Sequence, residues 1–341
     1  KTEWEIGGDF RFLDDKVSLS LTYYDNIIEG ILLNVALSPS SGYSTQYGNY
    51  GEMTNNGMEI DLGLDLIDTA EFGLSTAINW STNENEVTDL FGTESINLSP
   101  GASVSSRAVV GYPLGSLYGT GSQTNPDGSF ILNSNGFPQI TSSPIVLGDP
   151  NPDWRGGISL SMRYKKFRLN AVLEHSEGGD FSPRTLWVLN RFGTTQETAN
   201  RLTLDQPLVN YRGNTIPAGT TVRGNVRDFG GGPVLLDENW YRTGIGGGFG
   251  DNQAYNFSIA DATFTKLRDL SLSYVIDTPL VTNIGLSDVI VSVTGRDLIN
   301  INNVEGIDPE INTKGVSVAQ GVEYFTNPQT KGFLFSLTIN Y

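Results

Sequence analysis

Apolar and polar residues alternate with period two along many segments of this chain, whereas helical periodicity is nearly absent. In residues 333–341, one face would carry Phe333, Phe335, Leu337, Ile339 and Tyr341. Successive side chains of a β-strand point to opposite faces, so each such segment is apolar on one side and polar on the other. The pattern predicts about nine strands, at residues 6–12, 17–24, 58–67, 72–80, 158–164, 167–174, 264–276, 289–295 and 333–341.

These segments are long for strands of a soluble protein. Most exceed the roughly five to six residues of an average globular strand and approach the roughly nine to eleven that cross a bilayer at a tilt. Aromatic rings at the ends of apolar faces are typical of the girdles of outer-membrane barrels. Several segments end in this way, at Phe12, Tyr23, Trp80, Tyr164, Tyr274 and Tyr341. A soluble β-sandwich also has alternating strands and is the alternative interpretation, but it does not require strands of this length.

The connections between the predicted strands alternate between short and long. Residues 13–16, 68–71 and 165–166 form tight turns and 277–288 a moderate connection, whereas 29–56, 81–157, 175–263 and 300–332 are long. Outer-membrane barrels have this pattern because turns lie at the periplasmic rim and loops at the outer rim. About nine strands is odd, whereas bacterial single-chain barrels have even numbers of strands. The first and last strands would also leave open edges, and unpaired backbone groups in lipid cost several kcal/mol each. We therefore expect an all-β chain that forms the C-terminal portion of a larger transmembrane β-barrel with long extracellular loops.

Charge and composition exclude several classes of function. The 341 residues contain 21 Lys and Arg against 38 Asp and Glu, a net charge of −17, which is a poor match for nucleic acid. Cysteine is absent, and no run of about 18 apolar residues forms a candidate transmembrane helix. The one histidine, His175, has Glu174 and Glu177 beside it but no nucleophile partner and no zinc-type spacing, so we expect a rim residue. We predict no catalytic residue, no metal site and no cofactor.

Two acidic turns offer oxygen atoms of the kind that bind Ca²⁺. They contain Asp149 with Asp153 and Asp308 with Glu310, but they lack the regular ligand spacing of a calcium loop. Turn formation by Asp next to Pro is the better explanation.

The two longest loops are rich in aromatic residues, which are accompanied by many polar side chains. An aromatic ring is a platform for a sugar face or a peptide side chain, and neighbouring polar groups set its orientation. The alternative is that these rings pack the loops onto one another or onto a partner. We predict substrate-binding residues at Tyr112, Tyr118, Trp187, Trp240 and Tyr241.

Ordered motifs along nearly the whole chain resemble the SusC/RagA-type TonB-dependent outer-membrane transporters. Each motif is weak alone, whereas the order and spacing together are fairly specific. They are Glu3-Trp4-Glu5-Ile6-Gly7, Asn56-Gly57-Met58-Glu59-Ile60, Gly148 to Trp154, Leu267 to Tyr274, Thr294 to Leu298, Gly306 to Glu310 and the terminus Pro328 to Tyr341. The sequence departs from the family pattern at Asp297, where Asn is usual, and at Tyr341, where Phe is usual.

The resemblance implies a barrel of roughly 22 strands with a plugged lumen, of which residues 1–341 would be the C-terminal segment. By this resemblance, the plug domain, the TonB-contacting segment and the N-terminal strands are absent from this chain. It also implies TonB-dependent uptake of a glycan or peptide oligomer, a SusD-like surface lipoprotein as lid, and the outer membrane of a Bacteroidota-like Gram-negative cell. Two rival functions remain open: a β-sandwich adhesion or binding protein at the cell surface, and a TonB-dependent siderophore receptor.

Overall fold

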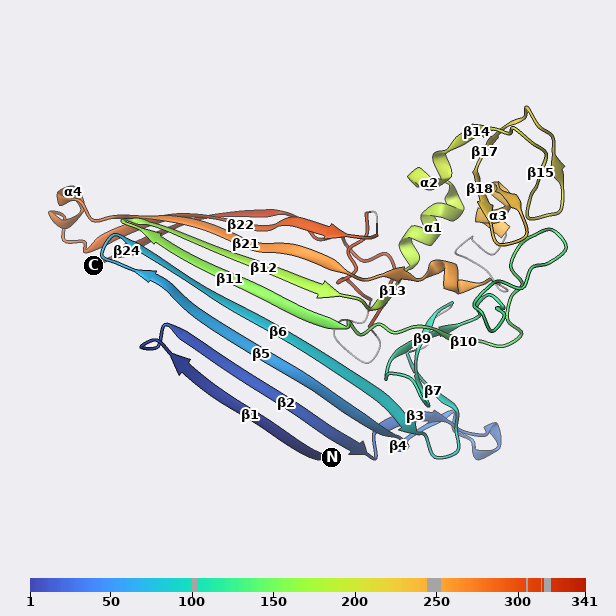
Figure 1. Ribbon diagram of the computed structural model, residues 1–341, viewed down its shortest axis with the longest axis horizontal. Coiled ribbons are helices and arrows are strands. Elements are labelled where there is room, and N and C mark those ends of the chain that lie inside the picture. Colours follow the sequence, from blue (N-terminus) through green and yellow to red (C-terminus); the bar gives the residue numbers. More distant parts are fainter. Residues whose placement is uncertain (100–102, 244–252, 305, 314, 316–319) are drawn as a thin grey trace.

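The computed structural model describes residues 1–99, 103–243, 253–304, 306–313, 315 and 320–341. Within these residues, nine antiparallel strands form one sheet in which every strand pairs with its sequence neighbours in the sheet (Figure 1). The nine strands are β1 (Thr2–Phe12), β2 (Val17–Glu29), β5 (Glu52–Asp68), β6 (Phe72–Asp89), β11 (Trp154–Tyr164), β12 (Phe167–Glu177), β21 (Phe264–Ile276), β22 (Asp288–Asn302) and β24 (Gly332–Asn340). The predicted all-β fold and its nine strands are confirmed.

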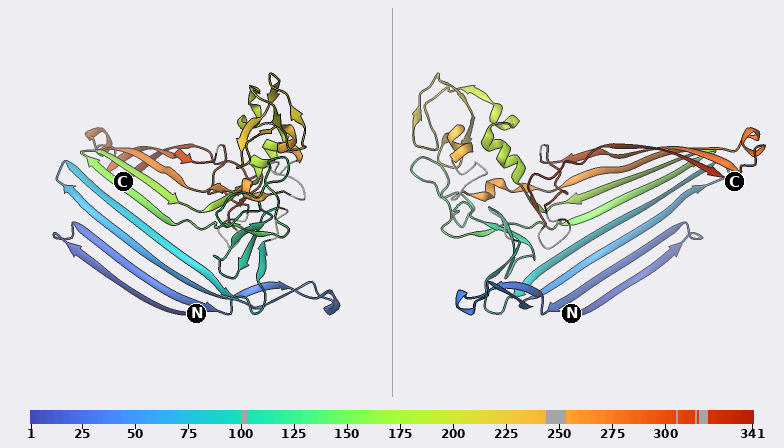
Figure 2. Two further views of the ribbon diagram at one scale, coloured as in Figure 1. Left: turned by 45° about the vertical axis from the view of Figure 1, so that its right-hand side comes forward. Right: turned by 180° about the vertical axis from the view of Figure 1, so that it is seen from behind.

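The sheet is curved and open. Its two edge strands, β1 and β24, do not pair with each other, and Figure 2 shows them well separated. The C-terminus lies at the end of the sheet with the short turns, whereas the N-terminus lies at the end with the long loops (Figure 1). Each edge strand therefore presents one side without a partner in this sheet.

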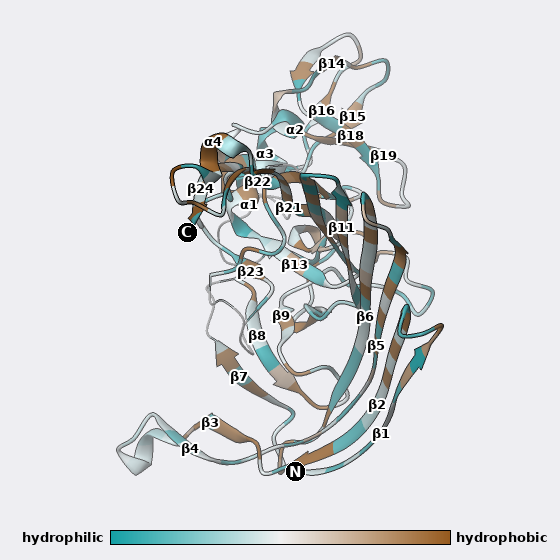
Figure 3. Cartoon of the chain, turned by 90° about the vertical axis from the view of Figure 1, so that its left-hand side faces the viewer, coloured by the Kyte–Doolittle hydropathy of each residue, from teal (hydrophilic) through white to brown (hydrophobic). Residues whose placement is uncertain are grey.

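One face of the sheet carries a continuous apolar band, because the strand register aligns the apolar residues of every strand. Across the sheet, Phe335 is opposite Val293, which is followed by Leu272, Leu169, Met162 and Leu74. At the other edge the band continues through Ile78, Leu62, Leu19 and Phe10. Figure 3 shows the resulting alternation of hydrophobic and hydrophilic residues along the strands.

Aromatic residues border this band at both ends. At the turn end, Phe72, Tyr164, Phe167 and Tyr274 occupy one row across four strands, with ring centroids 6.5 Å apart for Phe72 and Tyr164 and 4.6 Å apart for Phe167 and Tyr274. At the loop end, on the same face, lie Trp4, Tyr23, Trp80 and Trp154. Two rows of rings around an apolar band are the arrangement of a strand sheet embedded in a bilayer.

No second layer covers the band within the described residues. Phe335, Leu337 and Ile339 of β24 are 79%, 63% and 51% exposed, and no other sheet of the described residues packs on the apolar band. The apolar clusters of the described residues instead lie in the loops and at the loop ends of the strands. The β-sandwich alternative is therefore wrong, because a sandwich buries its apolar faces between two sheets.

Several strands are longer than the alternation predicted. β6 has 18 residues, about 60 Å at the usual rise, whereas its apolar part ends at Trp80. Its second half, residues 81–89, is polar on both faces apart from Val87, so period two is lost although pairing with β5 continues. These extensions project beyond the apolar band and carry the loops.

The loops contain the remaining elements. The first has β3 (Leu32–Ala36), η1 (Pro39–Ser41) and β4 (Thr45–Asn49), and the second β7 (Ser95–Ser99), β8 (Ser105–Val109), β9 (Ser116–Gly119) and β10 (Ile145–Gly148). The third has β13 (Asp180–Pro183), α1 (Arg184–Phe192), α2 (Gln196–Ala199), β14 (Arg201–Thr203), β15 (Leu208–Val209), β16 (Thr215–Ile216), β17 (Thr221–Arg223), β18 (Asn225–Asp228), β19 (Pro233–Leu236), α3 (Glu238–Thr243), η2 (Tyr255–Ser258) and β20 (Ala260–Asp261). The connection to β22 contains α4 (Pro279–Thr282), and the last loop β23 (Val322–Glu323). No helix among the described residues is long and apolar enough to cross a membrane.

Candidate functional site

The face of the sheet opposite the apolar band is polar. Serine, asparagine and charged side chains occupy it in register, as in the row Ser75, Ser161, Asn170, Ser271 and Thr294. Two shallow hollows of about 480 and 510 Å³ lie on this face. A polar concave face opposite an apolar band is what a water-filled barrel lumen requires.

The long loops gather at one end of this polar face and have apolar cores of their own. In one cluster, Phe137 packs against Trp240 with ring centroids 5.5 Å apart and against Tyr211 at 5.4 Å. A second cluster joins Leu33 of β3 to Val87 of β6 and Ala108 of β8. Loops of this size hold a fixed shape only when they bury side chains, so these clusters make the mouth of the polar face an ordered surface.

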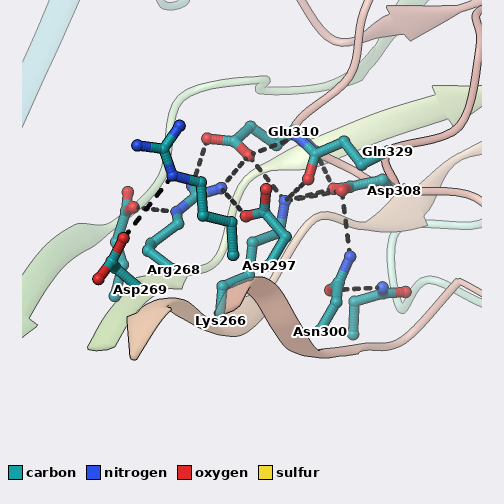
Figure 4. A network of polar contacts seen from close by, with 11 residues as sticks. Lys266, Arg268, Asp269, Asp297, Asn300, Asp308, Glu310 and Gln329 are labelled. Atoms are coloured by element: carbon teal, nitrogen blue, oxygen red, sulfur yellow. Dashed lines mark hydrogen bonds and ion pairs between the residues drawn. The ribbon is translucent and has the colours of Figure 1, made fainter. Parts of the chain in front are cut away.

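A network of ion pairs fixes the last loop to the wall at this mouth (Figure 4). Lys266 of β21 is 1% exposed, and its Nζ lies 2.7 Å from Asp308 Oδ2 and 2.7 Å from Glu310 Oε2. Arg268, at a bulge in β21, donates to Glu174 of β12 at 2.6 Å and to Glu310 at 2.8 Å. A buried charge is stable only when it is paired and hydrogen-bonded, so Asp308 and Glu310 hold the segment 306–313 against β21.

A second anchor joins the last loop to the 178–263 loop. β23 pairs in parallel with β13, and the buried Glu323 accepts hydrogen bonds from the backbone N–H of Thr185 at 3.1 Å and from its hydroxyl at 2.6 Å. The hydroxyl of Thr326 also donates to Glu323, at 3.0 Å. The described parts of the last loop are therefore anchored at two places, by Lys266 and by Thr185, and this loop is called the strap below.

The electrostatics of the strap differ from those of a neighbouring acidic turn. Burial works to raise the pKa of Glu310, but hydrogen bonds from Arg268 and Lys266 outweigh it and lower the pKa to about 2. Burial instead raises the pKa of Asp149 and of Asp180, and the negative charges nearby add to the rise. Glu310 is therefore ionised at neutral pH, and it pairs with the cations Lys266 and Arg268 of the wall.

The two acidic turns considered for Ca²⁺ have different surroundings. Asp308 accepts from Lys266, and Asp149 accepts from the backbone N–H of Asn151 at 3.0 Å, as in a turn. In the part of the chain that the structure describes, no group of three or more acidic, histidine or cysteine side chains is arranged to hold a metal ion. The interpretation as turns suits both, because Asp308 likewise accepts from the backbone N–H of Glu310 at 3.0 Å, but the ion pairs of Asp308 and Glu310 were not foreseen.

His175 lies at the loop end of β12, as the sequence predicted. Its Nδ1 is 2.8 Å from Thr265 Oγ1, its Nε2 is 2.9 Å from Glu177 Oε2, and its ring centroid is 4.7 Å from that of Trp154. The imidazole thus joins β12 to β21 and to the ring of Trp154 at the rim.

The five aromatic residues predicted to bind substrate fall into different environments. Tyr112, after β8, is 45% exposed; Tyr118 of β9 is half-buried, with the guanidinium of Arg107 4.5 Å from its ring centroid. Trp187 of α1 is half-buried, and its Nε1 is buried without a hydrogen-bond partner. Trp240 and Tyr241 are 4% and 5% exposed in a loop core. The structure therefore places Trp240 and Tyr241 in one loop core, where they pack the loop.

Sequence reasoning missed Lys266 and Arg268 as residues of the mouth. In the alternation of the sequence, Lys266 falls on the same face as Leu270 and Leu272, and only the bulge at Arg268 turns it to the polar face. Residue types alone did not show that the turn folds back onto this strand.

The fold and the mouth together define the wall of an outer-membrane-type β-barrel with an ordered outer rim. The family described as "TonB dependent receptor-like, beta-barrel" matches residues 2–144. The TonB-dependent receptor P3 of Formosa agariphila is 25% identical over 99% of this chain and 34% of its own length. The TonB-dependent receptor SusC of Bacteroides thetaiotaomicron is 27% identical over 51% of this chain and 19% of its own length.

The fold has solved counterparts in the same group. A chain of the RagAB peptide transporter superposes with a TM-score of 0.69 at 18% identity, over 99% of this chain and 35% of that one. This chain thus spans about a third of the length of the relatives that match nearly all of it. The resemblance to SusC/RagA-type TonB-dependent receptors is confirmed, and with it the location in the outer membrane.

Proposed function

We propose that this chain is the C-terminal part of the barrel of an outer-membrane transporter that takes up a glycan or peptide oligomer by TonB-dependent transport. The observation that carries the proposal is the nine-stranded sheet with an apolar band on one face, a polar concave face on the other, and an ordered mouth at one end. Lipid would cover the band, and the rest of the barrel would pair with β1 and β24. The plug and the TonB-contacting segment would belong to that rest.

The partners follow from the relatives and are part of the same proposal. SusC and the RagAB complex suggest a SusD-like lipoprotein as a lid over the mouth. The exposed ring of Tyr112 and the half-exposed rings of Tyr118 and Trp187 would contact substrate or lid, whereas Trp240 and Tyr241 would keep the rim in shape.

The test is uptake by cells that make the complete protein with its partner lipoprotein. Labelled oligosaccharides, oligopeptides and iron chelates are offered to these cells, to cells without the protein, and to cells in which TonB is absent. Uptake of an oligomer that needs both the protein and TonB supports the proposal. Uptake of iron chelates alone would identify a siderophore receptor, and equal uptake by all three strains would contradict transport.

A further inference from the structure

A recess of about 350 Å³ opens on the polar face at the mouth, where β6 and β11 separate after the pair Ser81 and Arg155. The wall contributes Tyr24 of β2, Glu59 of β5 and Asn83 of β6, which the register places on the same face as Arg155. The loops contribute Asn151 and Gln320. The recess is thus built from four strands and two loops.

Contacts within the chain hold the sides of this recess in place. The Tyr24 hydroxyl donates to Asn83 Oδ1 at 2.8 Å, and its ring lies across Gly57, where a Cβ would come within 2.3 Å of the hydroxyl oxygen. Only glycine leaves room for a ring laid flat on a strand in this way. On the loop side, Gln320 Nε2 donates to Asn151 Oδ1 at 3.0 Å. The recess is therefore preorganised rather than a gap between mobile side chains.

Two opposite charges border the recess without neutralising each other. Glu59 and Arg155 are both exposed, and neither forms an ion pair or a side-chain hydrogen bond with any described residue. They stand in one row with Ser81 between them, so two strand spacings, roughly 10 Å, separate their backbones. Each charge is thus available to a ligand that lies across β6.

The charged residues of the surrounding polar face differ between the strands on either side of β6. On β1 and β5 it carries Glu3, Glu5, Asp9, Glu59, Asp61 and Asp65, with Arg11 as the one cation. On β11 it carries Arg155 and Arg163, and on β12 Arg168 and Glu174, whereas β6 presents uncharged Ser75, Asn79 and Ser81. Arg163 and Arg168 are paired at the turn end, away from the recess, and Glu174 forms an ion pair with Arg268. Among the residues that line the recess, Glu59 on the β5 side and Arg155 on the β11 side are the two charged ones.

We propose that this recess binds a free oligopeptide in its zwitterionic form, with the amino group toward Glu59 and a carboxylate toward Arg155. An extended chain advances about 3.3–3.6 Å per residue, so roughly three residues span the two charges. Charge-assisted hydrogen bonds to an ammonium and a carboxylate are the strong ones, and a neutral glycan offers neither group. The inference rests on the proposed uptake function and specifies its substrate.

The test measures peptide binding to the complete transporter in detergent by calorimetry. The probes are a mixture of unblocked tri- to hexapeptides, the same mixture acetylated at the N-terminus, the same mixture amidated at the C-terminus, and neutral maltotriose. The proteins are the wild type, Glu59→Gln and Arg155→Gln, with Asp61→Asn and Arg168→Gln as controls on the same face outside the recess. All variants must keep the wild-type resistance of the barrel to heat in SDS.

We expect about a tenfold loss of affinity for unblocked peptides in Glu59→Gln and in Arg155→Gln, and little change in the two controls. Acetylation should weaken binding to the wild type and cancel the effect of Glu59→Gln, and amidation should do the same for Arg155→Gln. Equal affinities in all variants, or tighter binding of maltotriose than of peptides, would overturn the inference and leave TonB-dependent uptake intact. Failure of every oligomer to bind and to enter cells would overturn both.

Discussion

At the scale of single residues, Lys266 has the largest predicted effect on the mouth. Its ammonium is buried between Asp308 and Glu310, and the Asp308 side chain is only 6% exposed. In Lys266→Met the carboxylate of Asp308 loses its ion partner in a buried place, which costs about 3–5 kcal/mol. We expect the segment 306–313 around Asp308 and Glu310 to become sensitive to protease in the folded transporter.

The matched control for this variant is Lys165→Met. Lys165 pairs with Glu71 at 3.6 Å in an exposed position on the opposite rim, where such a pair contributes about 0–1 kcal/mol. Digestion followed by mass spectrometry should show the new cleavages only in Lys266→Met. The same cleavage pattern in both variants would contradict the role of the strap.

The strap should also respond to acid in a defined range. The pKa of Glu310 is about 2 in the folded protein against a reference value of 4.5, so its charge stabilises the docked loop fully above about pH 4.5. This contribution falls as the pH drops toward 2. Protease protection measured with an acid-active protease should be constant from pH 7 to about 5 and decline below, and this decline should be weaker in Glu310→Gln. A loss of protection near pH 6 would contradict this assignment.

At the scale of elements, the alternation in the sequence predicted the strands well because each strand faces two different surroundings. It failed where both surroundings are polar, as in residues 81–89 of β6, and it did not predict the nine-residue helix α1. α1 is short, and contacts with α3 and β23 hold it in place. The burial of Trp240 and Tyr241 depends equally on distant partners such as Phe137, which no local pattern reveals.

The last strand, β24, offers a direct comparison of its two faces. Leu337 lies on the apolar band, whereas Ser336 lies on the polar face opposite Ser292. Arginine on a lipid face costs about 2–4 kcal/mol near the middle of the bilayer, whereas a lumen position tolerates it. Leu337→Arg should therefore lower the yield of folded barrel in lipid vesicles, and Ser336→Arg should not. The yield is read from heat-modified mobility in SDS, and equal yields would contradict the assignment of the faces.

At the scale of the whole molecule, the sheet is stable only as part of something larger. Its edge strands β1 and β24 each lack a partner on one side, and its apolar band has no cover within the described residues. Both features agree with a chain about one third as long as its relatives. We therefore keep the proposal that residues 1–341 form the C-terminal segment of a barrel. The sequence motifs predicted this position, and the open sheet requires further strands.

The central claim is that the apolar band faces lipid and the opposite face water. The direct measurement is a nitroxide label attached to single cysteines at positions 333–340 of the complete transporter in bilayers, one position at a time; the 341 residues of this chain contain no native cysteine. Accessibility to oxygen, which dissolves in lipid, should peak at 333, 335, 337 and 339, and accessibility to a water-soluble nickel chelate at 334, 336 and 338. Uniform accessibility along the strand, or the opposite alternation, would contradict the account.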